Sequence, residues 1–227
     1  MSPRVLFVAG AHTEVGKTHV ACGLIRAARL RGWAVDALKP VVSGFDEDDW
    51  TESDPGRLLT AMERPLARQD LDRISPWRFA APLAPPMAAA RERRSLTLDP
   101  ISDFCRRRIA ASAADLMVVE GVGGLMSPIA EDATSLDLLV ALRPSSVLVG
   151  GGYLGAISHT LTALEVTRSR GFAPAAVIVS ESADRVAPDF AGTVALVAQH
   201  AGATPVFPAS RCGGDGWPEL ALNAVLA

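Results

Sequence analysis

The chain has 227 residues, 49% of them hydrophobic and 21% charged, with a formal net charge of −3. This composition indicates one folded domain with a sizeable core and excludes a disordered chain, and the small negative charge leaves no basic field for nucleic acid. The chain has no apolar run of membrane-spanning length. We expect no signal peptide, because the first predicted strand begins within a few residues, and the three scattered cysteines favour a reduced, cytoplasmic protein.

The first predicted elements are a strand, a loop and a helix. Residues 5–9 are an apolar run, and residues 10–18 have the sequence Gly-Ala-His-Thr-Glu-Val-Gly-Lys-Thr. Helical spacing follows over residues 18–31, and Gly32 is expected to end that helix. This order is typical of a phosphate-binding loop. In such a loop the unpaired backbone N–H groups at the start of the helix bind a polyphosphate, and the positive end of the helix dipole attracts its negative charge.

Two side chains of this loop carry the expected chemistry. Lys17 is predicted to contact the β- and γ-phosphates, and the Thr18 hydroxyl is predicted to bind Mg²⁺. Five residues separate Gly10 from Gly16, whereas the usual pattern has four, and Ala11 stands where that count requires glycine. An ordinary strand-to-helix turn with a surface lysine is the alternative interpretation.

The middle of the chain has weaker patterns. Residues 33–38 are predicted to form a second strand, which the following Lys-Pro pair closes. Residues 46–49 form an acidic loop, most simply a solvated turn. Residues 53–55, Ser-Asp-Pro, are a capping residue and a first-turn proline that start a helix. Residues 64–100 have poor periodicity and are expected to form loops and short helices packed on the sheet.

Helices and strands alternate over the rest of the chain. Helices are predicted over residues 101–114, 135–142, 156–170, 188–202 and 217–227, and strands over residues 115–120, 146–150, 176–180 and 205–207, the last at a sheet edge. This alternation predicts an α/β, three-layer fold like that of P-loop NTPases, with a mostly parallel central sheet and helices on both faces. Residues 1–227 are expected to form a single domain.

Several polar residues are expected to meet at one edge of this sheet, because right-handed crossovers place the loops after parallel strands there. They are Lys39, Ser43, Glu120, the glycines of residues 121–124 and 150–155, and Ser180-Glu181. Lys39 is equally explained as a strand-end lysine, and Asp54 as a helix cap. Glu120 is the clearest indication of a metal site. It ends an apolar strand just before a run of glycines, and nucleotide-binding folds commonly place a carboxylate near Mg²⁺ at that position.

Five segments together resemble the dethiobiotin synthetase family, ATP-dependent ligases of biotin biosynthesis. They are Thr-Glu-Val-Gly-Lys-Thr at 13–18, Lys-Pro-Val-Val-Ser-Gly at 39–44, Ser-Asp at 53–54, Val-Glu-Gly-Val-Gly-Gly at 119–124, and residues 154–159. They follow one another in the family's order and at its intervals over most of the chain. The five-residue spacing of the phosphate loop is also the family's own.

The resemblance implies a reaction and its participants. The implied substrates are ATP, CO₂ and 7,8-diaminopelargonate, and the implied cofactor is Mg²⁺. One amine takes up CO₂ as a carbamate, the carbamate receives the γ-phosphoryl group, and the second amine expels phosphate to close the ring of dethiobiotin. In such a reaction the protein positions the reactants and stabilises charge. A homodimer is also implied, with the acid tail of the substrate at the subunit interface.

The resemblance assigns roles to residues. The implied catalytic residues are Lys39, Lys17 and Thr13, and the implied Mg²⁺ ligands are Thr18, Asp54 and Glu120. The implied nucleotide contacts are Glu14, Val15, Gly16, Lys17, Thr18, His19, Ser180 and Pro208. The implied substrate contacts are Thr13, Lys39, Ser43, Gly123, Gly155 and Ser158.

The sequence departs from the family pattern at four places. His12 replaces an aspartate, Ala84-Pro85-Pro86 replaces Ser-Pro-His, Ser158 replaces an asparagine, and Ser180-Glu181 replaces the Asn-Asp near adenine. Serine is shorter than asparagine, and an ionised glutamate only accepts hydrogen bonds. We therefore expect weaker base selectivity, with other nucleoside triphosphates used within about tenfold of ATP.

Two alternative functions share the same motifs. The first is a switch ATPase of the partition or division-site type, but those proteins carry an extra lysine early in the phosphate loop, and residues 10–12 contain none. The second is an enzyme like the corrin amidation synthetases, which usually needs a glutaminase domain that this chain is too short to include.

Overall fold

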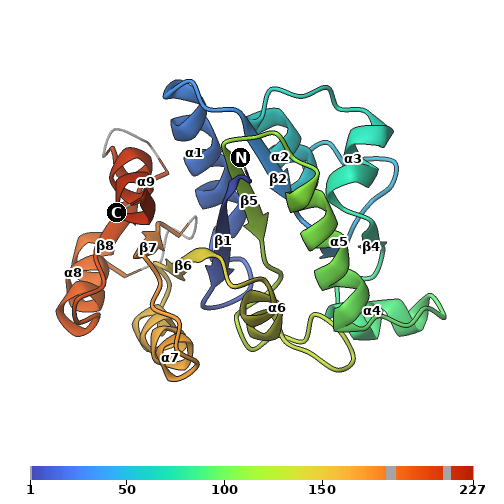
Figure 1. Cartoon of the computed structure of the whole chain (residues 1–227). Helices are drawn as coiled ribbons and strands as arrows, with labels where there is room; N and C mark the ends of the chain where they lie inside the picture. Colours follow the sequence, from blue (N-terminus) through green and yellow to red (C-terminus); the bar gives the residue numbers. More distant parts are fainter. Residues whose placement is uncertain (1, 183–187, 212–215, 227) are drawn as a thin grey trace.

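The computed structural model describes residues 2–182, 188–211 and 216–226. Its centre is a six-stranded sheet in the order β2-β5-β1-β6-β7-β8 (Figure 1). In that order the strands are β2 (Val35–Leu38), β5 (Leu116–Glu120), β1 (Arg4–Gly10), β6 (Ser145–Gly151), β7 (Ala176–Ser180) and β8 (Val206–Ala209). Every pairing between them is parallel, as predicted, so all six strands end at the same edge.

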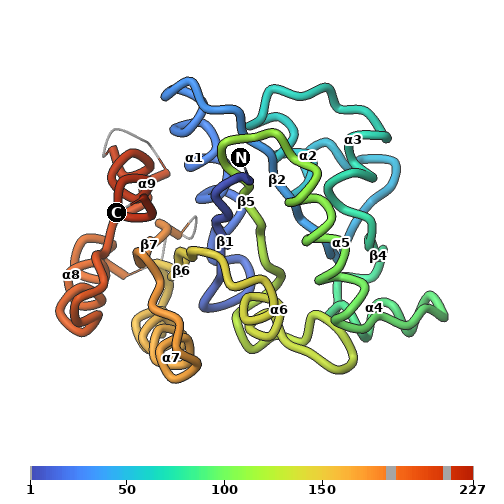
Figure 2. Tube along the Cα trace, viewed as in Figure 1, coloured from blue at the N-terminus to red at the C-terminus, as the bar shows by residue number. Residues whose placement is uncertain are grey.

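Helices cover both faces of the sheet. One face carries α1 (Lys17–Leu30) and α9 (Trp217–Leu226), and α2 (Asp54–Ala61) packs against α1. The other face carries α5 (Leu98–Ala110), α6 (Ser135–Leu142) and α7 (Ala156–Ser169) (Figures 1 and 2). Helix α8 (Phe190–His200) packs against α7 and β8. The predicted three-layer architecture is confirmed. Among the described residues, no helix is both long and apolar enough to cross a membrane.

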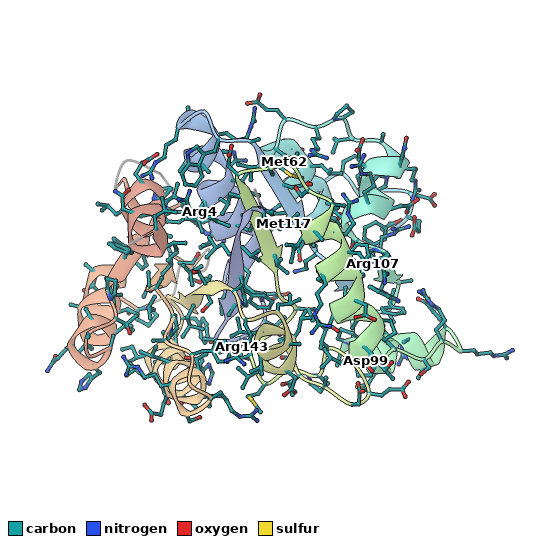
Figure 3. The ribbon with its side chains drawn as sticks, in the orientation of Figure 1. Arg4, Met62, Asp99, Arg107, Met117 and Arg143 are labelled. Atoms are coloured by element: carbon teal, nitrogen blue, oxygen red, sulfur yellow. The ribbon has the colours of Figure 1, made fainter. Side chains whose placement is uncertain are left out.

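The core follows the central strands. Leu6, Phe7 and Val8 of β1 and residues 116–119 of β5 have no exposed surface, and Figure 3 labels Met117 at the middle of the sheet. Strands covered on both faces need apolar side chains in both directions, which explains the continuous apolar runs in the sequence.

A second sheet, which the sequence does not predict, pairs β3 (Val41–Ser43) with β4 (Trp77–Phe79) in parallel. Short helices over residues 64–100 are confirmed by α3 (Arg68–Ile74) and α4 (Pro85–Arg91). Strands of three residues offer too few positions for an alternating pattern to be recognised. The acidic loop is more than a solvated turn, because its Glu47 carboxylate pairs with Arg68 and Arg78.

Element boundaries differ from prediction where distant residues decide them. The helix predicted over residues 101–114 begins at Leu98, whose N–H donates to the Asp132 carboxylate at 3.0 Å. The strand predicted over residues 33–38 begins at Val35, because the Trp33 N–H still donates to the Ala28 carbonyl at the end of α1.

Candidate active site

The phosphate loop runs from Gly10, at the end of β1, to Thr18 in the first turn of α1. Gly16 is the N-cap of α1 with a φ of 92°, a left-handed conformation that glycine adopts freely, and no side chain caps that turn. The first-turn N–H groups are therefore available for an anion. Lys17 folds back over the loop, and its Nζ donates to the His12 carbonyl at 3.3 Å. A Cβ on Gly10 would lie 2.8 Å from Lys17 Cδ, so this bend requires glycine.

Two carboxylates meet the Thr18 hydroxyl at the start of α1. Ser53 caps α2 as predicted, accepting from the Gly56 N–H at 3.4 Å, and so places Asp54 in the first turn of α2. Glu120 is the last residue of β5. The Thr18 Oγ1 atom lies 2.7 Å from Asp54 Oδ1 and 2.8 Å from Glu120 Oε1. A hydroxyl has one hydrogen, so it satisfies only one of these acceptors at a time.

Lys39 lies at the centre of this cluster. Its Nζ is 2.6 Å from Glu120 Oε1 and 2.8 Å from Asp54 Oδ2, and it donates to the Gly121 carbonyl at 3.0 Å. The side chain is 2% exposed. Its backbone N–H donates to the Ile74 carbonyl, which holds the lysine between β2 and β3. The alternative of a solvated strand-end lysine is wrong, because the ammonium group is buried against two carboxylates.

Burial and neighbouring charge shift the pKa values of all four charged groups. Burial lowers the pKa of Lys17 to about 8, and the Lys39 cation acts in the same direction. Burial also lowers the pKa of Lys39, but Asp54 and Glu120 outweigh it and hold it above the usual lysine range. Burial raises the pKa of Asp54, yet Lys39 prevails and lowers it to about 2. At Glu120, burial raises the pKa against the opposing effect of Lys39.

A cavity of about 430 Å³ opens over these groups and is called the main cavity below. Eleven of the residues that line it come from the sequence-based assignment. They are Thr13, Glu14, Gly16, Lys17, Thr18, His19, Lys39, Ser43, Asp54, Glu120 and Gly123. A second cavity of about 280 Å³ adjoins it at Glu14 and Gly16, which line both. The arrangement combines a phosphate-binding loop, two buried lysines and two carboxylates in one cavity.

The sequence as a whole also matches known proteins. A family model described as an AAA domain matches residues 4–208. The ATP-dependent dethiobiotin synthetase BioD of Phenylobacterium zucineum is 55% identical over 97% of this chain and 94% of its own length. The same enzyme of Caulobacter vibrioides is 50% identical over 92% of this chain and 93% of its own. The chain belongs to the dethiobiotin synthetase family.

Solved structures with lower identity share the fold alone. A ParA family ATPase from Chlorobium tepidum has a TM-score of 0.54 and 15% identity, over 99% of this chain and 92% of its own. The hydrogenase maturation factor HypB from Archaeoglobus fulgidus has a TM-score of 0.56 and 13% identity, over 99% of this chain and 91% of its own.

Five residues assigned from the dethiobiotin synthetase resemblance lie outside the main cavity. Val15 and Ser180 line the second cavity. Gly155 and Ser158 are exposed at the start of α7 and line neither cavity. Pro208, which lies in β8 opposite Val179, also lines neither cavity. The chain therefore assembles the phosphate end of the predicted site, but it does not bring the two α7 residues to it.

Sequence reasoning missed two features of this dethiobiotin synthetase family member. Arg57 and Arg211 both line the main cavity, and no motif marks either of them. The His12 ring stacks on His159 of α7, with ring centroids 5.3 Å apart and planes at 10°, and the Tyr153 hydroxyl lies 2.7 Å from His159 Nδ1. The residue that departs from the family pattern thus joins the phosphate loop to α7, a contact that only the fold reveals.

The Thr18, Asp54 and Glu120 cluster fits a magnesium ion. Glu120 Oε2 is buried without a hydrogen-bond partner, so the carboxylate has an acceptor oxygen to spare. Within the described residues, no group of three or more His, Cys, Asp or Glu side chains could hold a metal. Mg²⁺ suits a site with fewer protein ligands, because it commonly keeps water and substrate phosphate among its six oxygens.

Proposed function

We propose that this protein catalyses the ATP-dependent closure of 7,8-diaminopelargonate with CO₂ to dethiobiotin, as a ligase of biotin biosynthesis. The observation that carries the proposal is Lys39, buried between Asp54 and Glu120 in the cavity that the phosphate loop lines. A phosphate loop alone fits any nucleotidase. A second buried cation facing it fits a transfer in which negative charge develops between a nucleotide and a second anionic reactant.

The reaction proceeds in three steps. One substrate amine attacks CO₂ and loses a proton to give a carbamate. A carbamate oxygen attacks the γ-phosphorus of ATP, and ADP leaves. The second amine attacks the carbonyl carbon of this mixed anhydride, phosphate leaves, a proton is lost and the five-membered ring closes. Four side chains serve these steps. Lys17 binds the β- and γ-phosphates, and Lys39 binds the carbamate and the transferring phosphoryl group. Thr13 and Ser43 donate hydrogen bonds to the carbamate or the diamine.

Thr18, Asp54 and Glu120 would hold Mg²⁺, which when bound neutralises charge on the β- and γ-phosphates. Lys39 already pairs with both carboxylates. We also propose a cytoplasmic homodimer. Its support is the exposed position of Gly155 and Ser158, which suits contact with a substrate tail bound in the partner subunit.

A switch ATPase is not favoured. Its characteristic lysine is missing from residues 10–12, and the ParA family structure is similar in fold only. The test is phosphate release from ATP with diaminopelargonate and bicarbonate, compared with ATP alone, together with detection of dethiobiotin by mass spectrometry. Phosphate release that depends on both substrates and matches dethiobiotin formed supports the proposal. Equal release from ATP alone, without dethiobiotin, contradicts it.

A further inference from the structure

Three aromatic side chains form a cluster beside the phosphate loop. The His12 ring stacks on the His159 ring at a centroid distance of 5.3 Å, and the Tyr153 ring lies 5.8 Å from His12 and 5.7 Å from His159. The Tyr153 hydroxyl lies 2.7 Å from His159 Nδ1, and this hydrogen bond restrains the orientation of the His159 ring. These three residues are called the ring cluster below. The ring cluster joins the phosphate loop to the first turn of α7.

The backbone around His12 is also held in place. His12 Nδ1 lies 2.9 Å from the Thr13 carbonyl, which only accepts, so Nδ1 carries the proton and donates. The Ala11 N–H donates to the Val149 carbonyl at 2.8 Å. A Cβ on Gly124 would lie 3.0 Å from the Ala11 carbonyl oxygen and 3.3 Å from His12 Cα. The Gly124 backbone and the ring cluster therefore leave this part of the loop little room to move.

The His12 carbonyl connects the ring cluster to the buried lysine of the loop. Lys17 Nζ donates to this carbonyl at 3.3 Å, and Lys17 is 7% exposed. A rotation of the His12 peptide would therefore move the acceptor that holds the ammonium group. Between these two residues, Glu14 has a φ of 59°, a left-handed conformation that a residue with a Cβ keeps only when its surroundings hold it there. The loop thus depends on contacts outside itself for its shape.

We propose that Tyr153 and His159 are positioning residues, which act through the His12 ring to hold the phosphate loop and Lys17 in the conformation that binds a triphosphate. This inference rests on the proposed use of ATP. None of the three residues lines the main cavity, so their effect on the phosphates passes through the loop backbone and Lys17. A loop that is already in its binding conformation lowers the free energy of ATP binding. It strengthens binding of the ground state and the transition state alike, so turnover of bound ATP changes little.

The test is a double-mutant cycle between His12 and His159, in which calorimetry measures the dissociation constant of ATP with Mg²⁺. His12→Ala and His159→Ala are each expected to weaken ATP binding about fivefold, in the range of one aromatic pair. The double variant should bind no more weakly than either single variant, because each substitution already removes the same contact. His159→Phe keeps a ring beneath His12 and should bind ATP within about twofold of the wild type. His200→Ala, at the exposed end of α8, is the matched control and should behave as wild type.

Three further measurements separate positioning of the loop from a merely structural role. Inorganic triphosphate, which has no nucleoside, should lose the same factor as ATP in His159→Ala, because the effect is exerted at the phosphate loop. In the dethiobiotin assay, KM for ATP should rise in this variant while kcat stays within about twofold. The Tm of His159→Ala should stay close to the wild-type value, since the side chain is exposed.

Three outcomes overturn the inference. Additive losses in the double variant would show that His12 and His159 act separately. Unchanged ATP affinity in His159→Ala would show that the ring cluster does not position the loop. Undiminished binding of inorganic triphosphate in that variant would place the effect at the nucleoside. ATP binding does not require ring closure, so these outcomes are independent of whether dethiobiotin is formed.

Discussion

Two charged pairs at the carboxyl edge of the sheet differ in how they are held. At the phosphate end, Lys39 and Glu120 are buried and each depends on the other. At the ends of β7 and β8, Arg211 is exposed, and hydrogen bonds to Glu181 position it. Buried charges that lose a partner are strongly destabilising, whereas exposed ones are close to neutral. Substitutions at the phosphate end should therefore change chemistry and stability together, and those at Arg211 and Glu181 should leave stability nearly unchanged.

The largest expected effect is at Lys39. Lys39→Ala removes a cation from the transferring phosphoryl group, and turnover is expected to fall by about a hundredfold or more. It also leaves Asp54 and Glu120 facing each other, which costs about 3–5 kcal/mol of unfolding free energy. Mg²⁺ supplies charge to the same carboxylates, so the variant's deficit in Tm should be larger in EDTA than in excess Mg²⁺. Turnover near the wild-type value at saturating substrate would remove Lys39 from the catalytic residues.

The next effect concerns the metal requirement. Glu120→Gln is expected to raise the Mg²⁺ concentration for half-maximal turnover by about tenfold, because an amide is a weaker ligand than a carboxylate. Asp54→Asn should act in the same direction, while nucleotide binding without metal changes little. An unchanged Mg²⁺ profile in Glu120→Gln would restrict Glu120 to its ion pair with Lys39.

The same comparison explains what the sequence could and could not predict. The phosphate end is predictable because its residues follow contiguous motifs, at Gly16 to Thr18 and around Lys39, and because parallel strands must end at one edge. The contacts between these side chains could not be predicted from the motifs. The resemblance implies that Asp54 and Glu120 are Mg²⁺ ligands, but no motif predicts that both also contact Thr18 and Lys39.

The contact between Arg211 and Glu181 was not predictable in the same way. Arg211 lies 30 positions from Glu181 and belongs to no motif, and only the pairing of β7 with β8 brings them together. The β3–β4 sheet and the stacking of His12 on His159 have the same origin, since each depends on a contact between distant segments. Local patterns identify elements and loops well, but they do not encode which side chains meet across them.

Two glycines with the same backbone conformation sharpen the comparison further. Gly16 and Gly155 are helix N-caps with φ of 92° and 93°. A Cβ on Gly16 would lie 2.4 Å from Ser180 Oγ, whereas one on Gly155 has nothing within 4 Å. Both alanine variants carry backbone strain of about 1 kcal/mol, but only Gly16→Ala must also displace its neighbour. We expect about tenfold weaker ATP binding in Gly16→Ala and little change in Gly155→Ala; equal losses would mean that strain alone matters.

The smallest expected effect is the reactivity of the two buried cysteine thiols toward a labelling reagent. Burial raises the pKa values of Cys22, behind the phosphate loop, and Cys105, on α5, to about 12, so neither is a thiolate at pH 8. In a Cys212→Ser background, which removes a residue outside the described part of the chain, a thiol reagent should label nothing until the protein is denatured. Labelling of the native protein at the rate of a free thiol would show that the segments covering these two cysteines open readily.

The contact between α1 and α9 has a consequence for how the chain folds during synthesis. Trp217 packs against Gly23, where a Cβ would lie 2.7 Å from its ring, and Arg31 donates to Glu219 and to Asn223. The helix that begins in the phosphate loop is therefore completed by residues synthesised nearly 190 positions later. Contacts of such long sequence separation form late and slow folding. A nascent chain released before residue 217 would expose one flank of α1, and ATP binding should be acquired only as α9 docks.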